Sequence, residues 1–126
     1  MKLRLLDDSI RLRLSQSEVL AAREQGLVES QTRFADGSVF TYALEAAESA
    51  AAPSATYTRD RMVVRLSARA IEDWANDDAA VSLRGEVRLA DDRQLKLLVE
   101  KDFKCVAPRD DDEDQSDLYQ NRSTSC

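Results

Sequence analysis

The sequence predicts an α+β domain, mainly antiparallel β, built from two strand-strand-helix-strand-strand units. Three observations lead to this fold class. Apolar and charged residues alternate over several short segments, which is typical of half-buried strands. Helix-start signals stand between pairs of such segments, and the whole pattern occurs a second time along the chain. Together the two units contain eight strands and two helices, arranged either as a closed barrel or as two packed sheets.

The first unit covers about residues 1–46. Two alternating segments flank the turn Asp7-Asp8, and the stretch from Ser15 to Glu18 is a capping box that starts a short helix ending at Gly26. Two more strands follow, joined at the hairpin signal Asp36-Gly37. The apolar positions of the four strands are Leu3 and Leu5; Ile10, Leu12 and Leu14; Val28 and Phe34; and Phe40, Tyr42 and Leu44.

The second unit covers about residues 55–103, after a predicted linker over residues 45–56 that Pro53 interrupts. Arg65-Leu66-Ser67 repeats Arg13-Leu14-Ser15 at an offset of 52 (65 − 13), and the offset becomes 55 after the second helix. That helix starts at Ser67. Its predicted buried face is Ala70, Ile71, Trp74 and Ala75. Residues 1–103 are therefore expected to form one domain, followed by an acidic tail over residues 104–126.

Composition narrows the function classes. The net charge of −6 argues against a general nucleic-acid or membrane-surface binder. The chain has neither a long apolar run nor an export signal, so a cytoplasmic location is expected. With no histidine in the sequence, Ser-His and Cys-His nucleophile pairs are excluded and the commonest zinc ligand is missing.

The strand positions opposite the apolar stripe are strongly basic, with Glu29, Glu45, Glu86 and Glu100 among them. On an open sheet this is a solvated face with cross-strand ion pairs. In a barrel with this face inward it becomes a phosphate-binding channel. The residues that would bind phosphate are Arg4, Arg11, Arg13, Arg65, Arg84, Arg88 and Lys96. Glu100 and Asp102, with Glu86 and Glu45, are the carboxylates available for metal-dependent hydrolysis if the face is enclosed.

The tail contains the acidic run Asp110–Asp114 between the two cysteines. An EF-hand needs Gly at position six and Glu at position twelve, where this run has Gln115 and Asn121. A looser divalent or transition-metal site remains as an alternative to a disulfide and to two free thiols. Its ligands would be Cys105, Asp110, Asp112, Asp114, Asp117 and Cys126.

Two further hypotheses concern the same tail. Leu118 and Tyr119 directly follow the charged residues, and they are candidates to dock on the domain or on a partner. The acidic run is also expected to be attracted to the arginines of the domain and to fold back over them.

The chain resembles a small family of uncharacterised bacterial proteins. The residues that carry this likeness are the opening MKLRL, SIRLRLSQSEV, the FTYALE strand, and VEKDFKC with PRDDDEDQSD and a final cysteine. A more distant likeness is to the triphosphate-tunnel hydrolases, which are duplicated barrels with inward arginines, lysines and glutamates. Their first strand carries alternating glutamates, whereas residues 1–5 here are basic.

Three functions follow as alternatives. The first is a non-enzymatic domain that binds an unknown protein or a small anionic ligand, with the acidic C-terminal segment as its functional surface. The second is a phosphate-binding barrel or a divergent metal-dependent phosphohydrolase, and the third is a metal-binding protein that uses Cys105 and Cys126. No cofactor is predicted apart from a metal in the last two.

Overall fold

The computed structural model describes residues 1–48, 53–104 and 119 of the chain. These residues form eight strands and two helices in the predicted order, with a short 3-10 turn, η1, before the last strand. The elements are β1 (Lys2–Leu6), β2 (Ser9–Leu14), α1 (Gln16–Gln25), β3 (Leu27–Arg33), β4 (Val39–Ala47), β5 (Ser54–Thr58), β6 (Arg61–Ser67), α2 (Ala68–Asn76), β7 (Ser82–Arg88), η1 (Ala90–Asp92) and β8 (Gln94–Lys101).

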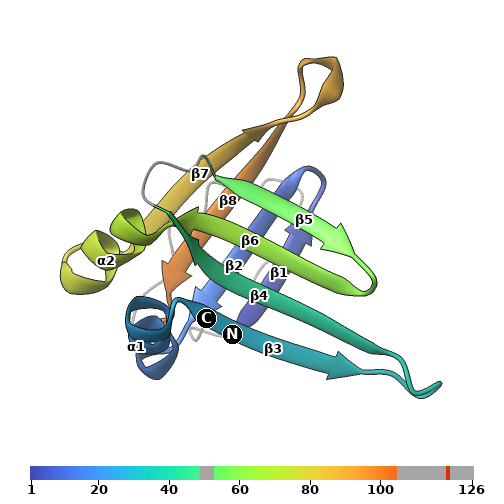
Figure 1. Ribbon diagram of the computed structural model, residues 1–126, viewed down its shortest axis with the longest axis horizontal. Helices are drawn as coiled ribbons and strands as arrows, with labels where there is room; N and C mark the ends of the chain where they lie inside the picture. Colours follow the sequence, from blue (N-terminus) through green and yellow to red (C-terminus); the bar gives the residue numbers. More distant parts are fainter. Residues whose placement is uncertain (49–52, 105–118, 120–126) are drawn as a thin grey trace.

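The strands form two four-stranded sheets. Sheet A has the order β1-β2-β8-β7, and sheet B has the order β3-β4-β6-β5. In each sheet the two outer pairs are antiparallel, whereas the central pair is parallel. Figure 1 shows sheet B in front of sheet A, with both helices together at one end of the sandwich. The prediction of two packed sheets is confirmed.

The two sheets have matching strand orders. When each element of the first unit is exchanged for its counterpart in the second, β1-β2-β8-β7 becomes β5-β6-β4-β3, which is sheet B read from its other edge. Each sheet therefore combines one hairpin from each unit. Because the parallel pairs β2–β8 and β4–β6 join the units, neither unit forms a sheet by itself.

The core lies between the sheets and under the helices. Leu12 and Leu14 of β2 and Leu44 of β4 are fully buried, and Ile71 and Trp74 bury the inner face of α2. The indole Nε1 of Trp74 donates a hydrogen bond to the backbone oxygen of Val81 at 3.1 Å, so its polar atom is satisfied inside the core. Most of the predicted apolar stripes are thus confirmed as the inner faces of the two sheets. The prediction is wrong for Leu5 and Phe34, which are more than half exposed, and Phe34 lies beyond the end of β3.

The helix boundaries follow the predicted signals. Ser15 accepts a hydrogen bond from the Glu18 backbone, Glu18 accepts one from the Ser15 backbone, and Gly26 ends α1 in the left-handed region with φ of 72°. In α2, the Ser67 side chain accepts from the Ala70 amide at 3.1 Å. No helix in the described ranges has the length and apolar character needed to span a bilayer.

The predicted linker over residues 45–56 is too long. β4 continues to Ala47, and β5 already begins at Ser54. Residues Glu45, Ala46 and Ala47 pair in parallel with β6, and this pairing outweighs the low intrinsic β-propensity of alanine and glutamate.

The prediction of a closed barrel with an inward basic channel is wrong. Among the described residues, β1, β7, β3 and β5 are each hydrogen-bonded on one side only, so both sheets stay open. The basic strand positions point away from the core, and the described part of the chain contains no buried charged residue. Because the core between the sheets is already filled by aliphatic side chains, the charged faces lie outside.

Candidate anion-binding site

The outer face of sheet A carries a cross-strand row of arginines. Arg4 of β1 lies opposite Arg11 of β2, Arg11 lies beside Leu98 of β8, and Leu98 lies opposite Arg84 of β7. We call these four residues the arginine row. It contains three positive side chains and no acidic residue. Glu100 of the next row lies 3.8 Å from it, measured from Glu100 Oε1 to Arg11 Nε.

The next row toward the helices is electrically balanced. The Arg13 Nε atom donates a hydrogen bond to Glu100 Oε1 at 2.6 Å, and Lys2 Nζ forms an ion pair with Asp102 Oδ2 at 2.8 Å. The carboxylates proposed for hydrolysis, Glu100 and Asp102, are therefore engaged in ion pairs on an open face. They do not form an enclosed pair.

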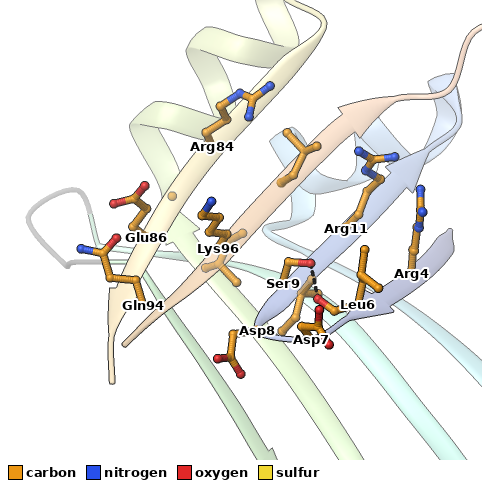
Figure 2. Close-up of a pocket in the computed structure, with 14 residues that line it drawn as sticks. Arg4, Leu6, Asp7, Asp8, Ser9, Arg11, Arg84, Glu86, Gln94 and Lys96 are labelled. Carbon is orange, nitrogen blue, oxygen red and sulfur yellow. Dashed lines mark hydrogen bonds between the residues drawn. The ribbon is translucent and has the colours of Figure 1, made fainter. Parts of the chain in front are cut away.

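The arginine row lines a hollow of about 490 Å³, which is within the range of small-molecule sites. Figure 2 shows Arg84 on one side of this hollow and Arg11 and Arg4 on the other. The lining residues are Arg4, Leu6, Asp7, Asp8, Ser9, Ile10, Arg11, Arg84, Gly85, Glu86, Gln94, Lys96, Leu97 and Leu98. We call this the basic hollow.

The acidic lining residues lie at the rim of the basic hollow. Asp7 and Asp8 form the β1–β2 turn, and Glu86 lies opposite Lys96 in the row nearest that turn. Four cationic and three acidic residues give the lining a net charge of +1 (4 − 3), on a chain whose net charge is −6. The positive charge is therefore concentrated in the arginine row.

The register places Arg4 and Arg11 directly opposite each other on neighbouring antiparallel strands. Like charges at such positions repel each other across the strands. Guanidinium groups bind phosphate and carboxylate oxygens through paired N–H donors. The row is thus suited to an oxyanion ligand.

The outer face of sheet B lacks this concentration of charge. Arg61 Nη2 donates to Glu29 Oε1 at 2.6 Å, and Arg65 lies 3.6 Å from Glu45. The hydrogen bond to Glu29 raises the pKa of Arg61 above its ordinary value. Arg65 also donates to the Thr56 hydroxyl at 3.1 Å. This face is a set of cross-strand ion pairs, as expected for a solvated sheet.

A comparison with protein families gives a match over nearly the full chain. A model described as "Family of unknown function (DUF7009)" matches residues 1–123. The chain belongs to this family. No curated protein and no solved structure matches the chain. The resemblance to a family without an assigned activity is confirmed.

The structure separates the residues predicted to bind phosphate. Four of them line the basic hollow: Arg4, Arg11, Arg84 and Lys96. Arg13 lies on the same face but pairs with Glu100. Arg88 lies on β7 two residues from Glu86 and outside the lining, and Arg65 lies on sheet B.

Sequence reasoning did not single out the uncharged residues of the hollow in this DUF7009 chain as site residues, among them Leu98, Gln94 and Ser9. Leu98 is half-buried between Lys96 and Glu100 on the outward-facing positions of β8. The available signal in the sequence was that Leu98 is apolar, whereas Lys96 and Glu100 at the neighbouring outward-facing positions are charged. Its meaning depends on the strand order, because only the pairing of β8 with β2 and β7 places it between arginines.

The remaining predicted site residues lie outside the described residues, with one exception. Cys105, Asp110, Asp112, Asp114, Asp117, Leu118 and Cys126 are not described, and no group of three or more acidic or thiol ligands occurs in the part that is. Tyr119 is described, and its side chain is fully exposed. A contact of Tyr119 with the domain or with a partner stays a prediction.

A second hollow of about 420 Å³ lies between α1, α2 and the end of β8. Its charged lining residues are Arg23, Lys101, Asp78 and Asp102, and their two positive and two negative charges cancel. Leu20 and Phe103, both about half exposed, contribute apolar surface. The second hollow therefore has no net positive charge to attract an anion, which distinguishes it from the basic hollow.

Proposed function

We propose that this protein binds a small anion of the phosphate class on the outer face of sheet A. The single observation that carries the proposal is the arginine row, in which Arg4, Arg11 and Arg84 come from three strands and no acidic residue shares the row. A ligand oxyanion would receive paired N–H donors from the guanidinium groups and a point charge from Lys96.

Two features favour a small ligand over nucleic acid. The four strands of sheet A contain no aromatic residue, so this face offers no platform for base stacking. The net charge of −6 opposes the approach of a long polyanion, whereas a small anion responds mainly to the local positive field.

The test is calorimetric titration with sodium tripolyphosphate at low ionic strength. A charge-assisted hydrogen bond contributes about 1.5–3 kcal/mol, so Arg84→Gln is expected to weaken binding roughly 10- to 100-fold. Arg88→Gln is the matched control, since it removes the same charge from the same strand and face but lies outside the hollow. It should change the affinity by less than about threefold, as a rim charge does.

Two outcomes would contradict the proposal. The first is the absence of binding by the unmodified protein. The second is an equal loss in both variants, because that would show attraction to overall charge rather than to the hollow.

The acidic C-terminal segment is a second proposed interaction site. It is supported by the full exposure of Tyr119, a large aromatic side chain that the domain leaves uncovered. A metal held by Cys105, Cys126 and the aspartates between them is the alternative for the same segment. A native mass of untagged protein, purified without chelator or reductant, decides between them: added mass lost on denaturation supports the metal, and a bare, reduced chain supports recognition by a partner.

A further inference from the structure

The arginine row has two positive poles. Arg4 and Arg11 lie on adjacent strands, about 5 Å apart in backbone spacing, whereas Arg11 and Arg84 are separated by β8, about 10 Å. Lys96, one row away on β8, lies diagonal to Arg84 and joins the second pole, and Glu86 lies directly opposite Lys96. Figure 2 shows the same division, with Arg84 and Lys96 on one side and Arg11 and Arg4 on the other.

Leu98 lies between the poles. Its side chain is half-buried and faces outward, in register with Arg11 on one side and Arg84 on the other. Covering apolar surface is worth about 25 cal/mol per Å², whereas placing a charged group over such surface costs desolvation energy. The centre of the row therefore favours an apolar group, and its two ends favour anions.

We infer that the ligand is an apolar molecule with an anionic group at each end, one group held by Arg4 and Arg11 and the other by Arg84 and Lys96, with the apolar part over Leu98. This inference rests on the proposed function and specifies the ligand class for the same site. Phosphates and carboxylates share the required chemistry, and an experiment with both kinds of end group tells them apart.

Alkane bisphosphonates measure the separation of the poles directly. Propane-1,3-, hexane-1,6- and decane-1,10-bisphosphonate have the same end groups and differ in spacing, and the hexane compound places its phosphorus atoms about 10 Å apart, close to two strand spacings. In calorimetric titrations the hexane compound should bind at least tenfold more tightly than the propane compound and than hexylphosphonate. Octanedioic acid, with carboxylate ends at a similar spacing, tests the other source of the same chemistry.

Variants connect the preference to named residues. Arg84→Gln should abolish the difference between the hexane and propane compounds, whereas Arg88→Gln should keep it. Leu98→Thr keeps a residue suited to a strand at an outward-facing position, so the fold should persist. The Leu98→Thr variant should bind the hexane compound about fivefold more weakly and should bind the propane compound with unchanged affinity. A thermal melt of each variant verifies the fold, and Leu98→Val is the milder second substitution.

The outcomes separate the inference from the proposed function. If tripolyphosphate and propane bisphosphonate bind as tightly as the hexane compound, the inference fails and the phosphate-class site stands. If none of these anions binds, the proposed function fails as well. A tenfold preference for the hexane compound that Arg84→Gln removes supports both.

Discussion

The two sheets have the same strand pattern and differ on their outer faces. In sheet A, the middle row reads Arg4, Arg11, Leu98 and Arg84. The counterparts in sheet B, at the offsets of 52 and 55, are Thr56, Val63, Ala43 and Glu29, and they form one row as well. The architecture therefore accepts ordinary strand residues at these positions.

This comparison is an internal control for the site. Sheet B shows a hydroxyl, two apolar side chains and a glutamate where sheet A has three arginines and a leucine. Val63 and Ala43 are buried, and Glu29 pairs with Arg61. Because equivalent positions in the same molecule are filled in this neutral way, the charge of the arginine row is a property of sheet A and not of the fold.

Substitutions on the inner faces of the two sheets should destabilise the protein to a similar extent, and this prediction has the largest expected effect. Leu14 and Leu66 are counterparts on β2 and β6, and both are almost fully buried. Leu14→Ala and Leu66→Ala should each lower the free energy of unfolding by about 2–5 kcal/mol, since each leaves a cavity in the shared core. Urea unfolding followed by Trp74 fluorescence measures both. A loss below about 1 kcal/mol in one variant only would show that the sheets do not share the core equally.

Substitutions on the outer face of sheet A should instead lower the affinity for anions and leave the stability nearly unchanged. Arg4→Thr, Arg11→Val and Arg84→Glu together give sheet A the residues of sheet B, and the triple variant should lose at least 100-fold in affinity for tripolyphosphate. Its free energy of unfolding should change by less than about 1 kcal/mol, because removing the opposed pair of arginines offsets the loss of the Arg11–Glu100 ion pair. Calorimetric titration and urea unfolding give the two values.

A matched control for the triple variant comes from sheet B. Arg33 is an exposed strand residue on β3, so Arg33→Gln should change neither property. A triple variant that is strongly destabilised would contradict the comparison, because it would show that the arginines support sheet A itself.

Local signals in the sequence predicted the elements well. The period-two stripes predicted all eight strands, and the serine and glutamate of the capping box predicted the start of α1. The central parallel pairs could not be predicted in this way. The pairing of β2 with β8 joins residues more than 80 positions apart, and it depends on packing between the units rather than on local pattern.

The candidate site was predictable as a set of residue types but not as a place. Arg13 and Arg11 are two residues apart on one strand, yet the register places Arg13 beside Glu100 and Arg11 beside Leu98. Arg13 Nε lies 2.6 Å from Glu100 Oε1, and Arg11 Nε lies 3.8 Å from the same oxygen. Period-two reasoning assigned both to the same charged face. Only the strand order shows which arginine has an acidic residue in its own row, and for the same reason Leu98 was missed.

The helices repeat the contrast between the units on a smaller scale. In α1, Glu18 completes a capping box with Ser15 and also pairs with the Met1 amino group, whereas α2 has Ala70 at the equivalent position and the Ser67 cap alone. Burial raises the pKa of Glu18, but the hydrogen bonds from the Met1 amino group and from Ser15 outweigh it, so the pKa lies below its ordinary value of 4.5.

The sign of the pH effect follows from this lowered pKa. The unfolded chain takes up the proton first as the pH falls, so the stability contributed by Glu18 is present above pH 4.5 and is lost as the pH falls through the folded-state pKa. Glu18→Gln should cost roughly 1 kcal/mol at pH 7, and the difference from the unmodified protein should shrink as the pH falls from about 5 through the lowered folded-state pKa. Urea unfolding at several pH values measures this difference.

The α2 cap is the control for this smallest effect. Ser67→Ala removes a cap that contains no carboxylate, so it should cost about 1 kcal/mol at every pH in the same range. If the Glu18→Gln difference were equally constant with pH, the ionised carboxylate would not be the stabilising form. The two helices would then be capped by neutral hydrogen bonds alike, and the contrast between the units would be confined to the outer faces of the sheets.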